Sequence, residues 1–193
     1  MTEDFRMDEK QGFSREKKQK IPAGLLFFRA GRTAFWQARL QEWCGRIGAE
    51  ILETEAAPDE EALLGRMDRM LSRFRLVFAV SGTVQGIPEA AEPVFRSLKL
   101  PREVLTEQRE CPGVRWLSAD TGWNCILKGE KQAIGLLADG GSSDRIEDAL
   151  KPIFSRLAEI ASVPLAPDPL QREAVPDFQS QAEELRFLLE NGS

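Results

Sequence analysis

Apolar residues along the chain fall into two patterns, short continuous runs and stripes with a spacing of three and four residues. Continuous runs predict buried strands, and spaced stripes predict amphipathic helices. Residues 25–28 and 75–80 form the clearest runs, and residues 50–54 form a weaker one. The two stripes between these runs comprise Trp36, Leu40, Trp43, Cys44 and Ile47, and Leu63, Leu64, Met67, Met70, Leu71 and Phe74. Predicted strands and helices therefore alternate through the first half of the chain.

Residues suited to helix ends lie beside both stripes. Thr33 is a candidate N-cap and Gly48 a candidate stop for the first helix. Residues 58–61, Pro-Asp-Glu-Glu, place acidic side chains at the start of the second helix, where the helix dipole favours them. Alternating strands and helices are typical of a mostly parallel sheet with helices on both faces. We therefore predict an α/β fold with three layers, α/β/α.

The second half of the chain adds a hairpin and a final helix. Two apolar segments, residues 124–127 and 132–137, flank a turn that contains a glycine, which predicts a β-hairpin. Residues 140–144, Gly-Gly-Ser-Ser-Asp, precede a stripe that consists of Ile146, Leu150, Ile153, Phe154, Leu157 and Ile160. Pro152 lies inside this stripe and predicts a kink or a division of the helix. Residues 101–121 have little periodicity and give no prediction.

The two ends of the chain differ from its middle. We predict a mobile N-terminal tail over residues 1–20, the α/β domain over 21–163, and a proline-rich linker with a short C-terminal helix over 164–193. From residue 166 onward there are six acidic and two basic residues, a net charge of −4. A helix that follows a linker must bury its apolar face, either against its own domain or against another subunit or a partner protein.

Composition excludes several classes of protein. The 193 residues carry a net charge of −5, which argues against a general nucleic-acid partner. No apolar run approaches the roughly 18 residues of a membrane span, so we expect no membrane partner. The three cysteines are widely spaced and the beginning has no signal-peptide pattern, so we predict reduced thiols and a cytoplasmic location. The chain has no histidine, so a Ser-His-Asp triad and a His-based zinc site are excluded and we predict no metal site.

Two loops that follow predicted strands are candidates for binding a phosphate. In an open α/β sheet, ligands gather at the carboxyl ends of the strands, and helix starts attract anions. The predicted cofactor-binding residues are Ser81, Gly82, Thr83, Asp139, Gly140, Gly141, Ser142 and Ser143. Arg29 and Arg32, beside the end of the first strand, are candidates for facing an anionic ligand. An ordinary turn that leads into a helix has the same composition, and both interpretations stay open.

Five segments carry a resemblance to a known family. They are residues 47–51 (Ile-Gly-Ala-Glu-Ile), 57–71, 76–83 (Leu-Val-Phe-Ala-Val-Ser-Gly-Thr), 122–137 and 138–144. Together they make the chain, over roughly residues 22–162, similar to the molybdopterin-binding fold. That fold is shared by molybdenum-cofactor biosynthesis proteins and by the N-terminal domain of competence/damage-inducible proteins. The resemblance implies a pterin-phosphate site on the loops, and Glu89 stands at the position of the family's aspartate, as a candidate catalytic residue.

Some positions of the family's loop are changed in this chain. Ser81 and Val84 stand in place of glycines, and Ala91 stands in place of a threonine. The family binds molybdopterin, and some members adenylylate it or insert the metal. One hypothesis is therefore a divergent domain that binds molybdopterin or a related phosphorylated pterin or nucleotide, with catalysis reduced or lost. The alternative is a non-catalytic scaffold or regulatory protein that uses the same fold for homo-oligomer or partner contacts.

Overall fold

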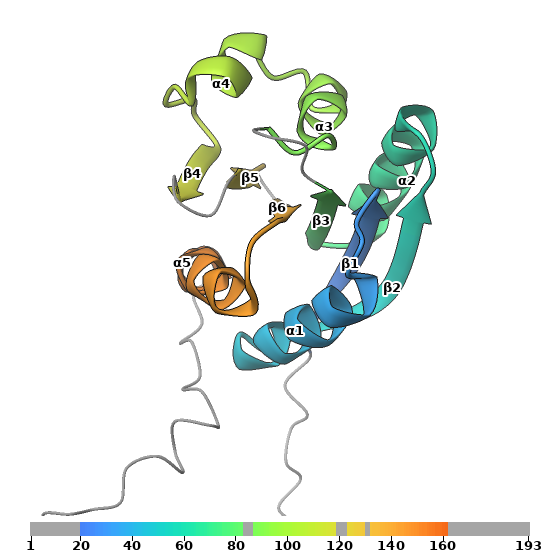
Figure 1. Cartoon of the computed structure of the whole chain (residues 1–193), viewed down its shortest axis with the longest axis vertical. Coiled ribbons are helices and arrows are strands. Elements are labelled where there is room, and N and C mark those ends of the chain that lie inside the picture. The colour runs from blue at the N-terminus through green and yellow to red at the C-terminus, as the bar shows by residue number, and fades with distance from the viewer. Residues whose placement is uncertain (1–19, 83–86, 119–122, 130–131, 162–193) are drawn as a thin grey trace, which may run out of the picture.

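A computed structural model describes residues 20–82, 87–118, 123–129 and 132–161, which form a six-stranded sheet between two layers of helices (Figure 1). The strands are β1 (Ile21–Phe28), β2 (Ala49–Ala57), β3 (Leu76–Gly82), β4 (Val114–Ser118), β5 (Asn124–Lys128) and β6 (Ala133–Asp139). Their order across the sheet is β2-β1-β3-β6-β5-β4. The first four strands in this order are parallel, and β5 and β4 are antiparallel to their neighbours. The predicted α/β class, with a mostly parallel sheet and a hairpin (β5 and β6), is therefore confirmed.

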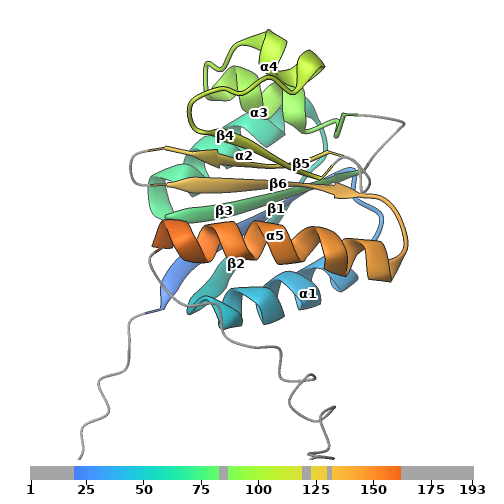
Figure 2. The ribbon, with the colours of Figure 1, turned by 90° about the vertical axis from the view of Figure 1, so that its left-hand side faces the viewer.

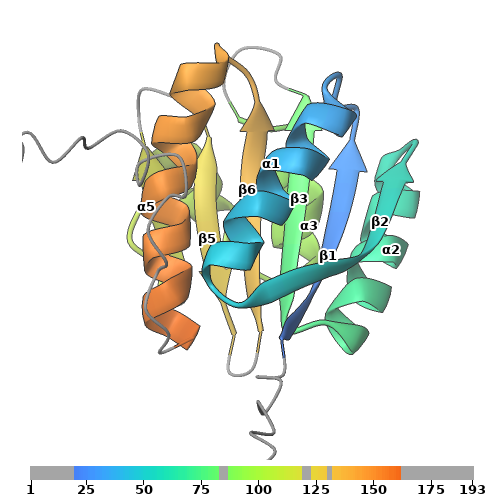
Figure 3. The same ribbon diagram turned by 90° about the horizontal axis from the view of Figure 1, so that it is seen from below.

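Five helices cover the two faces of the sheet in the described part of the chain, so three layers are present (Figure 2). The helices are α1 (Thr33–Arg46), α2 (Glu60–Arg73), α3 (Ala91–Ser97), α4 (Arg102–Glu107) and α5 (Ser143–Ala161). Figure 3 shows α1 and α5 side by side across one face. On that face Phe154 stacks on both Trp43 and Phe78, with ring centroids 5.3 and 5.4 Å apart. Each such ring contributes roughly 1.5–3 kcal/mol through its burial.

The other face is covered by α2, α3 and α4, and its core is separate from that under α1 and α5. Large side chains there include Phe28, Met67, Met70, Phe95 and Trp123. The apolar stripe predicted for the second helix supplies Leu63, Met67, Met70 and Phe74 to this core. Because the central strands contact helices on both faces, they are apolar at nearly every position, as the continuous runs in the sequence indicated.

Two predicted helix ends differ in detail from the structure. Thr33 is the first residue of α1, and the N-cap is Arg32, whose side chain makes no capping hydrogen bond. The prediction of Thr33 as the cap is therefore wrong. Gly48 follows the C-cap of α1 with a φ of 69°, the left-handed conformation that favours glycine, as predicted. Pro152 does not divide α5, which is continuous from Ser143 to Ala161.

The segment without a prediction, residues 101–121, contributes α4 and the edge strand β4 in its described part. The predicted N-terminal tail, residues 1–20, lies outside the described residues apart from residue 20. The predicted linker and C-terminal helix, residues 164–193, also lie outside them, so these boundaries remain predictions. Within the described residues, no helix is long and apolar enough to cross a membrane.

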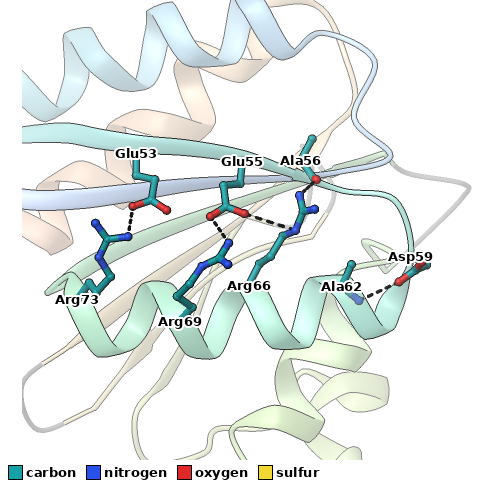
Figure 4. A network of polar contacts seen from close by, with 8 residues as sticks. All are labelled: Glu53, Glu55, Ala56, Asp59, Ala62, Arg66, Arg69 and Arg73. Carbon is teal, nitrogen blue, oxygen red and sulfur yellow. Dashed lines mark hydrogen bonds and ion pairs between the residues drawn. The ribbon is translucent and has the colours of Figure 1, made fainter.

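The opposite edge strand, β2, is tied to α2 by ion pairs (Figure 4). Glu55 pairs with both Arg66 and Arg69, and Glu53 pairs with Arg73. Burial opposes the charge of Glu55, but hydrogen bonds and the two arginines outweigh it and lower the pKa of its carboxyl group. Acidic side chains on an edge strand discourage pairing with another chain, and here α2 holds them in place.

Candidate functional site

The two predicted phosphate loops leave the sheet at the same edge. Strands β3 and β6 are parallel neighbours, and Gly82 at the end of β3 is in register with Asp139 at the end of β6. On the other side of β3, Ser81 is in register with Phe28, the last residue of β1. The carboxyl ends of β1, β3 and β6 therefore meet, as expected for a ligand site in an open parallel sheet.

The carboxylate of Asp139 accepts four hydrogen bonds at this edge. Its Oδ2 accepts from the backbone N–H of Gly31 at 2.7 Å and of Arg32 at 3.1 Å. Its Oδ1 accepts from Arg32 Nε and from Trp36 Nε1, both at 2.8 Å. The Asp139 side chain is 4% exposed and that of Arg32 is 37% exposed, so the carboxylate of this ion pair is shielded from water while its partner is partly solvated.

These contacts fix the protonation state of Asp139. Burial of the carboxylate raises its pKa, but the hydrogen bonds from Trp36, from Arg32 and from Gly31 together outweigh this effect. The pKa of Asp139 therefore lies below its ordinary value, and the group is ionised at neutral pH. A carboxylate in this state is a weak base and makes a poor proton acceptor in catalysis.

Asp139 ties the loop between β1 and α1 to the end of β6. The two amides that donate to its Oδ2 belong to Gly31 and to the N-cap residue Arg32, so they lie just before Thr33, the first residue of α1. Asp139 lies more than 100 residues further along the chain than these two residues. A carboxylate of the same protein therefore lies next to this helix start, a position that favours a negative charge.

Gly82 packs directly against the loop that follows β1. A Cβ atom at this position would clash with the carbonyl oxygen of Arg29, so the close approach requires glycine. Arg29 itself has a φ of 51°, a left-handed conformation that is uncommon for a residue with a side chain. The backbone of the β1–α1 loop therefore occupies the space beside Gly82.

Glu89, the predicted catalytic residue, forms an ion pair at the same edge. Its Oε2 accepts a hydrogen bond from Arg29 Nη1 at 3.1 Å, and the side chains are 27% and 57% exposed. The Arg29 guanidinium also lies 5.0 Å from the centre of the Phe28 ring. Arg29 and Arg32, both candidates for facing an anionic ligand, thus each pair with a carboxylate of the protein.

The remaining predicted residues lie beside these contacts. Ser81 is fully buried, and its Oγ has no hydrogen-bond partner within the described part of the chain. Gly141 has a φ of 86°, and its carbonyl accepts a hydrogen bond from Arg32 Nη1 at 3.0 Å. Ser142 and Ser143 are exposed at the start of α5, next to the half-buried Gly140. Thr83 lies outside the described residues, as does the rest of its loop up to residue 86.

Sequence reasoning missed three of the residues that complete this edge. It assigned Trp36 to the core, which is correct for its ring, but the indole N–H also donates to Asp139. It gave no role to Gly31. Asn124, at the start of β5, accepts a hydrogen bond from the backbone N–H of Ala138 at 3.0 Å and so holds the end of β6. No signal for these contacts was recognised in the sequence, because Thr33 was predicted to cap the first helix itself.

The fold resembles a known structure, while the sequence matches no known family. No protein-family model matches the chain, and no curated protein matches it significantly. The crystal structure of a protein described as CinA with unknown function, from Thermoplasma acidophilum, matches with a TM-score of 0.56 and 13% sequence identity. The match covers 72% of this chain and 98% of that one. It supports the α/β fold expected from the resemblance to competence/damage-inducible proteins, and at this identity it shows the fold alone.

Proposed function

We propose that this protein is a non-catalytic scaffold or regulatory protein with a molybdopterin-binding-like fold. The observation that supports it is Asp139, whose carboxylate binds the loop before α1 and accepts four hydrogen bonds from the protein itself. The pairing of Glu89 with Arg29 supports the same conclusion. At this edge, side chains that were candidates for facing a ligand instead bind groups of the same protein.

Two physical consequences argue against catalysis at this edge. A phosphate that approached the start of α1 would meet the negative charge of Asp139 and would have to displace it from four donors. A general base must also be able to take up a proton near neutral pH, which a carboxylate with a lowered pKa does poorly. The replacement of two family glycines by Ser81 and Val84 is consistent with the same loss.

Calorimetric titration of the full chain with AMP, ATP and molybdopterin tests this proposal. We expect no saturable heat up to millimolar ligand. Saturable binding in the micromolar range would overturn the proposal and restore the ligand hypothesis. Matched titrations of an Asp139→Ala variant sharpen the test, because removing the carboxylate leaves the amides of Gly31 and Arg32 free for an added anion.

A second candidate is binding of molybdopterin or another phosphorylated ligand at the start of α5. The buried Ser81 hydroxyl, without a partner among the described residues, favours it, because such a group ordinarily has one. The exposed Ser142 and Ser143 would supply hydroxyl and amide donors at the start of α5. Binding that is weakened by Ser81→Ala and by Ser143→Ala, and that is unaffected by Ser72→Ala on α2, would favour this candidate over the scaffold.

A further inference from the structure

The opposite end of the sheet, where the parallel strands begin, is hollowed. Three cavities of about 830, 540 and 160 Å³ lie there, and Lys128 lines all of them. The largest, here named the amino-end groove, runs between β4 and α5. Its lining includes Cys111, Val114, Arg115, Trp116, Arg156 and Ile160. This location is distinct from the edge formed by Ser81, Asp139 and Glu89.

The amino-end groove combines positive charge with apolar surface. Arg115 and Lys128 are exposed and form no ion pair with any described residue, whereas Arg156 pairs with Glu159 at 2.6 Å. Glu110 is the one acidic residue in the lining. The apolar part of the groove includes Val114, Ile126 and Ile160. Such a surface fits a segment that is both apolar and acidic.

The chain leaves the described domain at this groove. Helix α5 ends at Ala161, which lines the 540 Å³ cavity, and Ile160 lines both that cavity and the groove. Residues 162–193 follow and carry a net charge of −4. The described domain also begins at this end, because Ile21 lines the 540 Å³ cavity, but the six basic and five acidic residues at positions 1–20 do not complement a positive groove.

We propose that residues 177–190 of the same chain bind in the amino-end groove. This segment has four acidic residues and one basic residue, and its apolar residues are Phe178, Leu185, Phe187, Leu188 and Leu189. The connecting residues 162–176 can span up to roughly 50 Å, so they reach any point of the groove. Because the segment is tethered, its effective concentration at the groove is in the millimolar range, and a weak contact is sufficient.

The chemistry of the contact follows from the two surfaces. The phenylalanine and leucine side chains cover the apolar lining at Val114 and Ile160, and the carboxylates of Glu183 and Glu184 approach Arg115 and Lys128. The proposal does not depend on the proposed function, because it concerns the other end of the sheet.

The rate at which N-ethylmaleimide labels Cys111 tests the proposal in the full chain. Cys111 lines the groove and is half-buried, whereas Cys44 and Cys125 are buried in the core. Burial raises the pKa of Cys44 to about 12 and also raises that of Cys125, so neither forms a reactive thiolate at neutral pH. Peptide mass spectrometry then distinguishes the three sites. We expect Cys111 to react about tenfold faster in a Phe187→Ser, Leu188→Ser variant than in the natural chain.

The control variant is Gln179→Ser with Gln181→Ser, in the same segment, which should leave the Cys111 rate unchanged. A variant that fails to fold would expose Cys44 and Cys125 as well, so unfolding is distinguished from release of the segment. A Cys111 rate that is the same in the natural chain and in the Phe187→Ser, Leu188→Ser variant would overturn the proposal.

Charge-reversal variants and measurements at high salt or after dilution test which surface contacts the segment. Arg115→Glu should also speed the labelling of Cys111, and adding Glu183→Arg and Glu184→Arg to it should slow the labelling again. Because the charge pairs are near the surface, the protection should weaken at high salt. Protection that disappears on dilution would overturn docking within one chain and assign the groove to the segment of a second copy. Failure to restore protection in the charge-swapped variant would overturn the charge pairing.

Discussion

The two ends of the sheet have opposite properties. At the carboxyl end, Asp139 and Glu89 pair with groups of the same protein, and Gly82 lies against the backbone of the β1–α1 loop. At the amino end, Arg115 and Lys128 border cavities and have no ion-pair partner among the described residues. In open α/β proteins the ligand site is usually at the carboxyl end. Here Asp139 and Glu89 are paired at that end, and the cavities described above lie at the other end.

This difference is consistent with the general rule that a fold alone does not determine where a protein binds its ligands. The strand order brings the carboxyl ends of β1, β3 and β6 together whatever side chains they carry. Whether that edge binds a ligand depends on a few side chains, above all on whether the helix starts are left free. In this chain Asp139 binds the loop before α1, which supports our proposal that this edge serves as a structural contact.

The largest expected effect comes from removing the Asp139 carboxylate. Asp139→Ala leaves the N–H groups of Gly31 and Trp36 and the charge of Arg32 without their acceptor. We expect the free energy of unfolding to fall by about 3 kcal/mol, as for other partly shielded charge pairs that lose one member. Urea denaturation measures this change. Added formate, which can take the place of the carboxylate, should recover part of the stability.

The account of the carboxyl end would be contradicted if Asp139→Ala reduced the free energy of unfolding by no more than Glu89→Ala does. Glu89 is the matched control because its ion pair with Arg29 lies at the same edge but is more exposed. Exposed pairs contribute roughly 0–1 kcal/mol.

The next effect is expected at Gly82. Gly82→Ala places a methyl group against the carbonyl oxygen of Arg29 and should reduce the free energy of unfolding by about 1–3 kcal/mol. Gly45 in α1 is the matched control, because a Cβ atom there meets no other atom within 4 Å. Gly45→Ala should be neutral or stabilising by up to about 1 kcal/mol. Thermal unfolding of the Gly82→Ala and Gly45→Ala variants measures both changes in stability. A Gly82→Ala variant that is as stable as the natural chain would contradict the close packing at Gly82.

The pH dependence of stability should report on Asp139. Its pKa is lower in the folded protein than in the unfolded chain, so the ionised form stabilises the fold. This contribution is fully present above the unfolded-state pKa of about 3.9 and is lost as the pH falls through the lower folded-state value. The stability difference between the natural chain and Asp139→Asn should therefore be constant from pH 7 to 5 and shrink below pH 4. A difference that grows as the pH falls would contradict this sign.

The smallest effects are expected for exposed ion pairs. Glu55→Gln removes a carboxylate that pairs with Arg66 and Arg69 and should cost about 1 kcal/mol. Glu89→Gln removes a single pair and should cost about half of that. Both losses should decrease at high salt, which denaturant titrations at two ionic strengths can measure. If Glu89→Gln reduced the free energy of unfolding by more than Glu55→Gln does, Glu89 would have a further partner.

Much of the fold could be predicted from local patterns. Continuous apolar runs gave β1 and β3 because these strands are buried on both faces, and spaced stripes gave α1, α2 and α5 because each helix buries one side. The antiparallel β5 and β6 followed from a glycine-bearing turn between two apolar segments. By contrast, α4 and β4 were missed because they are short and their apolar residues show little periodicity.

The site could be predicted only in part. Sequence placed Gly82 and Asp139 at strand ends, and the structure brings them side by side. Sequence could not show that Asp139 would bind the start of α1, because the contact joins residues more than 100 positions apart. The same limit applies to the pairing of Glu89 with Arg29. Such contacts depend on strand order and on the path of loops, which a local pattern does not contain.

The central claim is that the carboxyl end of the sheet is closed to phosphorylated ligands. The most direct measurement is an NMR titration of the isotope-labelled full chain with ATP, followed at the backbone amides of Gly31, Arg32, Gly82 and residues 140–143. The proposed closure predicts that these signals do not move in a saturable way up to millimolar ATP. Saturable shifts at two or more of these amides would contradict it and would show that the edge still accepts a phosphate.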